Sequence, residues 1–111
     1  MMDSDFGHLF LIISDSLRYD TMRSEMPFLC ELAADGIDIK RCYSAGPGTP
    51  SSMPAMMQSR LAIEHGGYGL DLPLEPATLA EQVSDTGVKT LGLHSNTYTT
   101  ASAGFDRGFD A

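Results

Sequence analysis

The amino-acid sequence predicts an α/β fold, a parallel sheet with flanking helices, on the basis of three observations. Apolar runs typical of strands alternate along the chain with segments of helical spacing. Strands that are separated by helices need crossover connections, which produce a parallel sheet covered by helices. The 111 residues are 42% hydrophobic and 20% charged, which suits a globular protein with a modest core. We therefore expect a single domain over residues 1–111.

The first part of the chain predicts two strands with a helix between them. Residues 8–14 form a continuous apolar run, as in a strand that is buried on both faces of a parallel sheet. Residues 26–34 have apolar side chains at helical spacing, with Pro27 in the first turn and Gly36 as the stop. Residues 37–43 alternate imperfectly and are predicted to be the second strand.

A loop rich in glycine and proline, residues 44–50, leads into a short helix. We expect this helix to begin at about Ser51 or Ser52 and to end at Ser59. Pro54 is compatible with such a helix only if the helix begins that late, because proline is tolerated in a first turn and disrupts a helix interior.

The remaining chain predicts one more helix and one more strand. A long connection, residues 60–76, precedes a helix over 77–86, which Gly87 ends. Residues 88–93 are the third predicted strand, and residues 95–111 are irregular. Three strands make a small sheet with two open edges, so we expect the domain to be incomplete. It is either part of a larger fold or pairs an edge with itself or with a complementing chain.

Charge excludes one class of function. Fifteen acidic residues face seven basic ones, which gives a net charge of −8. General nucleic-acid binding is therefore disfavoured, because no basic patch is present to displace counterions from a phosphate backbone. The same acidity, with Lys40 and Lys89 as the two lysines, fits a protein solvated at high salt, where self-repulsion is screened.

The sequence predicts a cytoplasmic protein without a membrane partner. No apolar run approaches the roughly 18 residues that span a bilayer. Residues 1–5 are acidic where a signal peptide is basic. Cys30 and Cys42 make neither a disulfide framework nor a zinc-ligand spacing, so a reducing compartment is expected.

Asp15 is a candidate metal ligand because it directly follows the first predicted strand. Ligands of open parallel sheets bind beyond the carboxyl ends of the strands. Carboxylate oxygens suit hard cations such as Mg²⁺, Ca²⁺ or Mn²⁺. The alternative is that Asp15 is the N-cap of a helix in the Ser16 segment.

Thr49 is a candidate nucleophile because it lies just before a predicted helix start. Helix N-terminal amides favour developing negative charge and phosphate-like groups beside such a hydroxyl. The alternative is that Thr49, Ser51 or Ser52 only caps the helix. His65 and His94 are either acid–base or ligand residues, or exposed loop residues.

Several segments, in chain order, resemble the sulfatase family of the alkaline phosphatase superfamily. Residues 11–20 (LIISDSLRYD) resemble its first strand and metal loop, and residues 27–37 resemble the helix that follows. Residues 43–52 resemble its nucleophile loop. GLHSN at 92–96 and GFDRGFD at 104–110 are similar to its third strand and the next loop. The resemblance implies the N-terminal part of an alkaline-phosphatase-like α/β fold.

The resemblance implies roles for two residues. Asp15 matches a metal-binding aspartate, although Ser16 stands where many members have a second one. Thr49 stands where sulfatases have the Cys or Ser that becomes formylglycine, and Met53 stands where that motif has arginine. Threonine cannot become formylglycine, but phosphodiesterase relatives in the superfamily use threonine as the nucleophile directly.

The resemblance therefore implies the N-terminal segment of a metal-dependent hydrolase of small sulfate or phosphate esters. Its divalent cation would be Ca, Mg, Mn or Zn. Family members take their other metal ligands from the C-terminal half, so Asp15 and Thr49 are expected to act only in a complete protein. The alternative is a non-catalytic remnant that folds by self-association or with a partner chain, in which both residues act as caps.

Overall fold

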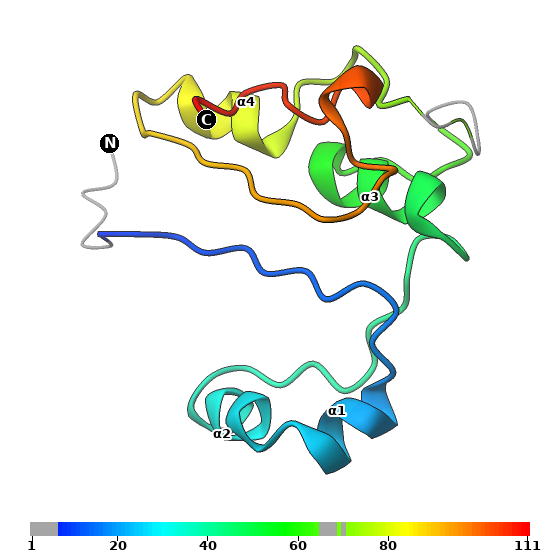
Figure 1. The fold of residues 1–111 in the computed structure, drawn as a ribbon, viewed down its shortest axis with the longest axis vertical. Helices are drawn as coiled ribbons and strands as arrows, with labels where there is room; N and C mark the ends of the chain where they lie inside the picture. The colour runs from blue at the N-terminus through cyan, green and yellow to red at the C-terminus, as the bar shows by residue number, and fades with distance from the viewer. Residues whose placement is uncertain (1–6, 65–68, 70) are drawn as a thin grey trace. The chain divides into compact units, whose positions relative to one another are not determined.

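The computed structural model describes residues 7–64, 69 and 71–111. It divides into two units, Met1–Arg41 and Cys42–Ala111, called unit 1 and unit 2 below. The helical elements are α1 (Tyr19–Glu25), α2 (Pro27–Asp35), α3 (Thr49–Gln58), α4 (Leu79–Ser84) and the 3-10 helix η1 (Ala101–Ala103) (Figure 1).

Unit 1 is built around two short helices, α1 and α2, that contact each other (Figure 1). Met26 ends α1 and begins α2: its N–H donates to the Met22 carbonyl at 3.2 Å, and its carbonyl accepts from the Cys30 N–H at 3.2 Å. Pro27 opens α2 and Gly36 caps its C-terminus, as the sequence predicted. This helix is thus specified by local signals alone.

The two strands predicted in unit 1 are absent from the described residues. Residues 8–14 and 37–43 contain no assigned strand, and the side chains of Leu9 and Ile12 are 83% and 87% exposed. A strand forms only where its N–H and C=O groups pair with a neighbour. No backbone hydrogen bond among the described residues joins residues 8–14 to another segment. The prediction of a buried strand here is therefore wrong for this structure.

In unit 2, α3 begins at Thr49, earlier than predicted, and ends at Gln58. Pro50 in the first turn has the φ that a helix start needs, which explains the early start. Pro54 consequently lies inside the helix, where it has no N–H to offer the carbonyl of Pro50. Ser59 ends the helix in the left-handed conformation, with φ 54°.

A clasp of polar groups connects distant parts of unit 2. The Arg107 guanidinium donates to both carboxylate oxygens of Glu81, at 3.1 and 2.8 Å, and to the carbonyls of Pro73 and Leu74, at 2.6 and 2.8 Å. The Gln58 side-chain amide donates to the carbonyls of Pro73 and Pro76, at 2.7 and 2.6 Å. Pro73 thus joins the end of α3 to Arg107. We call Gln58, Glu81, Arg107 and the 73–76 turn the polar clasp.

The C-terminal loop also packs on α4, which is shorter than the predicted helix (Figure 1). Thr78 and Glu81 form a capping box at its start, and the Thr78 hydroxyl also donates to the Arg107 carbonyl at 3.1 Å. Gly108 has φ 85°, and a Cβ there would overlap the backbone of Ala80 and Glu81. This close approach explains why glycine occupies the position.

The third predicted strand, residues 88–93, is also not assigned as a strand. It does run beside the C-terminus: the Asp110 N–H donates to the Thr90 carbonyl at 3.0 Å, and the Gly92 N–H donates to the Ala111 carbonyl at 2.9 Å. The Thr90 N–H donates to the Asp110 side-chain carboxylate instead of to a backbone carbonyl, at 2.8 Å. The Asp110 side chain therefore replaces the backbone carbonyl that would accept this hydrogen bond in a regular sheet.

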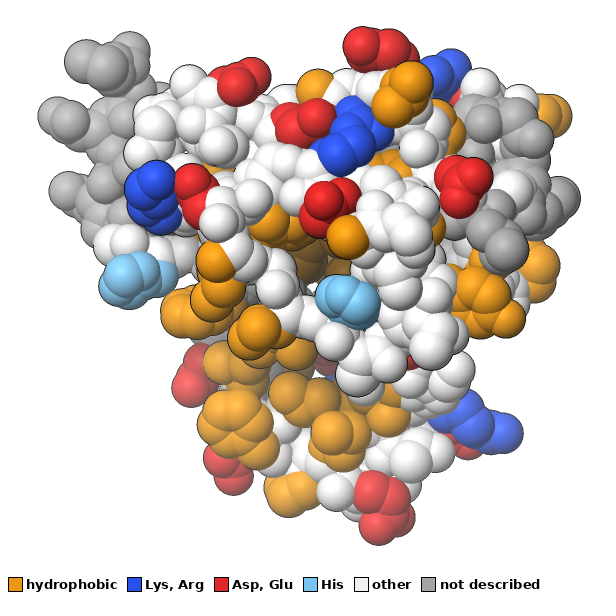
Figure 2. All heavy atoms as spheres, turned by 45° about the horizontal axis from the view of Figure 1, so that its top comes forward, with side chains coloured by type: hydrophobic (Ala, Val, Ile, Leu, Met, Phe, Trp, Pro, Cys, Tyr) orange, Lys and Arg blue, Asp and Glu red, His pale blue; other side chains and the backbone are white. Residues whose placement is uncertain are grey.

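Few apolar side chains are buried. The buried apolar residues within the described ranges are Pro54, Ala62, Leu72 and Ala80. Large apolar side chains lie at the surface, as the orange spheres in Figure 2 show. No described helix has the length and apolar character required to cross a membrane.

Candidate functional site

Three hydroxyl side chains lie in the first turn of α3, and they have different hydrogen-bond partners. Ser51 and Ser52 each donate to the Gly48 carbonyl at 2.9 Å, and Ser51 is only 1% exposed. The hydroxyl of Thr49 instead accepts a hydrogen bond from the side-chain amide of Asn96, at 3.4 Å. The N-cap residue is Gly48, so the alternative that Thr49, Ser51 or Ser52 caps the helix is wrong. Of the three, Thr49 is the hydroxyl that faces another segment of the site.

Asn96 is held so that its NH₂ group faces Thr49. Its side-chain oxygen accepts from the Tyr98 N–H at 2.8 Å, which distinguishes the two ends of the amide. Its main-chain carbonyl accepts from the Thr99 N–H and hydroxyl, at 3.2 and 3.1 Å. The sequence analysis gave Asn96 no role. Its position three residues after the predicted strand 88–93 was the signal that could have found it, because such residues lie near the functional edge of a parallel sheet.

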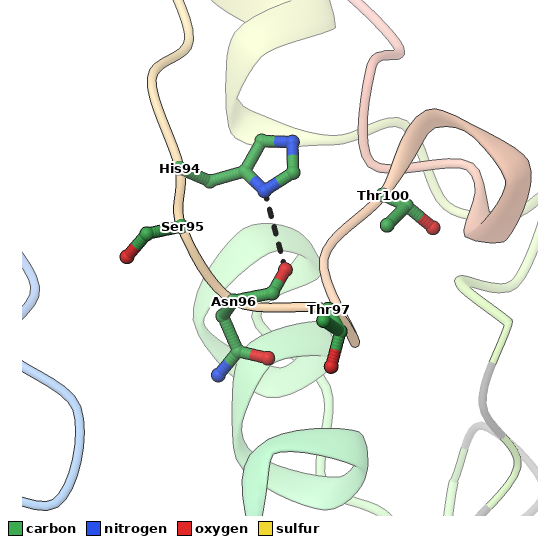
Figure 3. A pocket seen from close by; sticks show the side chains of 5 residues that line it. All are labelled: His94, Ser95, Asn96, Thr97 and Thr100. Carbon is green, nitrogen blue, oxygen red and sulfur yellow. Dashed lines mark hydrogen bonds between the residues drawn. The ribbon is translucent and has the colours of Figure 1, made fainter.

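His94 contacts the same turn. Its Nδ1 lies 3.2 Å from the Asn96 carbonyl, and a hydrogen bond there requires the tautomer with a proton on Nδ1, because a carbonyl can only accept (Figure 3). The imidazole and the Asn96 amide point in different directions (Figure 3). These residues, with Ser95, Thr97 and Thr100, line a hollow of about 170 Å³ that we call the amide hollow. His65 lies outside the described residues.

Asp15 belongs to unit 1 and lies on an exposed turn. The next residue, Ser16, has φ 58°, and its hydroxyl donates to the Asp15 carboxylate at 3.4 Å. The N-cap of α1 is Arg18, so the alternative that Asp15 caps a helix is wrong. A turn that presents a carboxylate in this way is compatible with a metal ligand.

A complete cation site is not formed by the described residues. No group of three or more His, Cys, Asp or Glu side chains gathers within residues 7–64, 69 and 71–111. A hard divalent cation takes about six oxygen ligands, of which water supplies only some. The described residues therefore do not fit a bound cation by themselves, and Asp15 would be one ligand among several.

The geometry defines a class of site: a hydroxyl on the first residue of a helix, with an amide donor beside it.

Residues 8–111 match the sulfatase family. The chain is also 34% identical, over 82 residues, to the "low-salt glycan biosynthesis sulfotransferase Agl7" of Haloferax volcanii. No solved structure matches the chain. The protein belongs to the sulfatase family, as its sequence motifs predicted.

The family match implies an alkaline-phosphatase-like α/β fold, and members of the family generally use a divalent metal ion. The helices of the structure agree with that fold class, whereas its strands are not formed among the described residues. The matched segment covers 72% of this chain and 18% of the Haloferax protein. The chain thus spans less than a fifth of the length of that relative.

Proposed function

We propose that this chain supplies the nucleophile region of a sulfatase-like hydrolase of sulfate or phosphate esters, with Thr49 as the nucleophile. The observation that carries the proposal is the hydrogen bond from the Asn96 amide to the Thr49 hydroxyl at the N-terminus of α3. The family supports ester chemistry, and Thr49 is the first residue of α3 and faces Asn96, whereas Ser51 and Ser52 donate to the Gly48 carbonyl.

In the proposed reaction the Thr49 oxygen bonds to the sulfur or phosphorus of the ester, and the alcohol leaves. Water then cleaves the threonine ester and regenerates the hydroxyl. The N-terminus of α3 carries partial positive charge, which favours the oxygens of the ester group. Because the Asn96 N–H donates to the Thr49 oxygen, the hydroxyl proton is not directed at Asn96, and during attack it is proposed to pass to a base or to the leaving alcohol. During attack the same N–H can donate to an ester oxygen as negative charge develops there.

Asp15 is proposed as one ligand of a divalent cation whose other ligands are outside the described residues. When bound, such a cation offsets negative charge on the ester oxygens. Oxygen ligands favour Mg²⁺, Ca²⁺ or Mn²⁺ over softer ions. Because a single carboxylate holds a hard cation weakly, hydrolysis is proposed to need a complete ligand set, and the 111-residue chain alone is proposed to be inactive.

A second candidate is transfer of the sulfuryl group to an alcohol instead of to water. The name of the Haloferax relative, a sulfotransferase of glycan biosynthesis, favours it. The first step at Thr49 would be the same, and only the acceptor in the second step would differ.

The test is hydrolysis of 4-nitrophenyl phosphate and 4-nitrophenyl sulfate by the native protein purified from its own cells. Thr49→Val, which keeps the side-chain shape and removes the hydroxyl, should lower kcat at least about 1,000-fold. Asn96→Ala should lower it about 100-fold. Ser52→Ala is the matched control, because it removes a neighbouring hydroxyl that already bonds to Gly48. Equal rates for Thr49→Val and Ser52→Ala would contradict the proposal and favour a non-catalytic remnant.

Metal binding by Asp15 is tested separately on the 111-residue chain. Mn²⁺ should broaden the NMR signals around residue 15 at millimolar concentration, and Asp15→Ala should abolish this broadening. Asp35→Ala is the control, because Asp35 is an exposed aspartate at the end of α2 in the same unit. Broadening that survives in Asp15→Ala would rule out Asp15 as the ligand.

A further inference from the structure

Gln58, the last residue of α3, is polar but buried. It is 4% exposed and lies on the buried face of the helix with Ser51 and Pro54. Its NH₂ group donates to the Pro73 and Pro76 carbonyls at 2.7 and 2.6 Å. Its Oε1 atom is buried and has no hydrogen-bond partner among the described residues. A buried acceptor without a donor is destabilising and offsets the gain from the two hydrogen bonds, so Gln58 adds little net stability.

The 73–76 turn, to which Gln58 donates, is also attached to the segment that carries Asn96. Leu72, directly before this turn, is buried, and its N–H donates to the Ala103 carbonyl at 2.8 Å. Ala103 is the last residue of η1, the 3-10 helix that follows Asn96 in the chain. The turn therefore contacts α3 on one side and the Asn96 segment on the other.

The hydrogen bond between Asn96 and Thr49 closes a ring of contacts within unit 2. From Thr49 the ring runs along α3 to Gln58 and the 73–76 turn. From there it continues to η1 and back along the chain to Asn96, whose side chain extends toward α3 (Figure 3). At 3.4 Å this last hydrogen bond is longer than the roughly 2.7–3.2 Å of a typical N–H···O bond. A small displacement of either segment is therefore sufficient to break it.

We propose that Gln58 is a positioning residue for Thr49. By holding the end of α3 on the 73–76 turn, it keeps the Thr49 hydroxyl within reach of the Asn96 amide. The inference rests on the proposed function for its effect on the rate, whereas the contact itself can be measured without a reaction. Gln58 lies at the other end of α3, roughly 13 Å from Thr49 along the helix, so it acts through Thr49 and Asn96 and does not touch the ester.

The first test compares NMR spectra of the 111-residue chain with those of Gln58→Met, which keeps the side-chain volume and removes both donors. The side-chain NH₂ signals of Asn96 should shift toward those of an asparagine in open solvent. The melting temperature should fall by less than about 5 °C, because the unpaired oxygen is removed together with the two hydrogen bonds. Gln82→Met is the matched control and should change neither quantity, because the exposed Gln82 amide donates to the nearby Ala77 carbonyl at 3.2 Å.

Two results of this comparison would overturn the inference. The first is a Gln58→Met chain whose Asn96 signals stay where they are in the unsubstituted chain. The second is a Gln58→Met chain that melts more than about 5 °C lower or does not fold, because Gln58 would then serve the stability of the fold.

The second test measures hydrolysis of 4-nitrophenyl phosphate and 4-nitrophenyl sulfate by the native protein. Gln58→Met should lower kcat about 10-fold and leave KM within twofold, because it displaces the attacking group without removing a contact to the ester. In an Asn96→Ala background the same substitution should have no further effect, because the contact through which it acts is already lost. A 10-fold loss that persists in that background would overturn the inference. If Thr49→Val leaves the rate unchanged, the proposed function fails, while the NMR comparison still decides whether Gln58 holds Thr49 beside Asn96.

Discussion

Unit 1 and unit 2 hold their segments together by different means. In unit 1, α1 and α2 are neighbours in sequence, and the described long-range polar link is the Arg23–Asp38 ion pair, at 3.3 Å. In unit 2 the polar clasp joins segments 15 to 34 residues apart. Neither helix of unit 1 has a buried residue, whereas α3 and α4 both do. In unit 2, where the apolar core is small, partly buried polar contacts hold distant segments together.

The largest expected effect comes from removing the cation of the polar clasp. Arg107→Met should destabilise unit 2 by about 1.5–3 kcal/mol, because it removes the charged donor of Glu81 and of the Pro73 and Leu74 carbonyls. Urea unfolding followed by circular dichroism measures the change. Arg18→Met is the control, because the Arg18–Asp20 pair is exposed and should contribute nothing measurable. Equal losses in the two variants would refute the contrast between the units.

Gly108 tests how closely the C-terminal loop approaches α4. Gly108→Ala should cost about 2 kcal/mol, because a Cβ there meets the backbone of Ala80 and Glu81 in addition to the positive φ. Gly87→Ala is the matched control, since Gly87 has φ 84° but open space around it, and should cost about 1 kcal/mol. The difference in unfolding free energy between the two variants measures the close approach. If they are equally stable, the loop does not lie against α4 as the structure has it.

The polar clasp also predicts a pH dependence. The Arg107 guanidinium holds the pKa of Glu81 below its usual value of 4.5, and the Thr78 N–H adds to the effect. A lowered pKa means that the unfolded state takes up the proton first as the pH falls. The stabilisation by Glu81 should therefore be complete above about pH 6, and it should be lost as the pH falls from about 4.5 through the lowered pKa.

Acid unfolding curves of unit 2 check this dependence. Glu81→Gln should flatten the curve below about pH 4.5, whereas Glu75→Gln, an exposed glutamate of the same unit, should not. A Glu81→Gln protein with an unchanged acid limb would show that the ion pair does not contribute to stability.

The smallest expected effect is the difference between the two units in how much salt slows hydrogen exchange. Unit 1 has eight acidic and four basic residues in 41 positions, and unit 2 has seven and three in 70. The net negative charge is thus denser in unit 1. Molar KCl should slow hydrogen exchange in both units, and more in α1 and α2, because salt screens self-repulsion. Faster exchange at high salt would reverse the interpretation of the acidic composition.

The sequence predicted the parts of the fold that depend on local signals. Pro27 and Gly36 bound α2 where they were expected, and Gly87 follows the shorter α4. A strand needs a neighbouring strand, which can be distant in sequence. The apolar pattern of residues 8–14 predicts that this segment is buried, but it does not identify the segment with which it pairs. Such a segment stays extended and exposed when no neighbour pairs with it.

In the candidate site, too, features that depend on local sequence were predicted and contacts between distant residues were not. Thr49 was predicted in the loop just before a helix, because glycine and proline mark that loop in the sequence, and the structure makes it the first residue of α3. Asn96 was given no role because its contact with Thr49 spans 47 residues, and its place after a predicted strand indicates the sheet edge but not that contact. The alternative in which Asp15 and Thr49 cap helices is wrong for a related reason. The N-caps are Arg18 and Gly48, because the helices begin at residues that the residue types alone do not determine.

The central claim, that Thr49 is the nucleophile, is tested most directly by trapping the covalent intermediate. The native protein would be mixed with 4-nitrophenyl phosphate or 4-nitrophenyl sulfate, quenched in acid and digested, and its peptides analysed by mass spectrometry. The account predicts a phosphoryl or sulfuryl group on Thr49 and none on that peptide in Thr49→Val. A group on Ser51, Ser52 or any other residue, or no modified peptide while the ester is being hydrolysed, would contradict it.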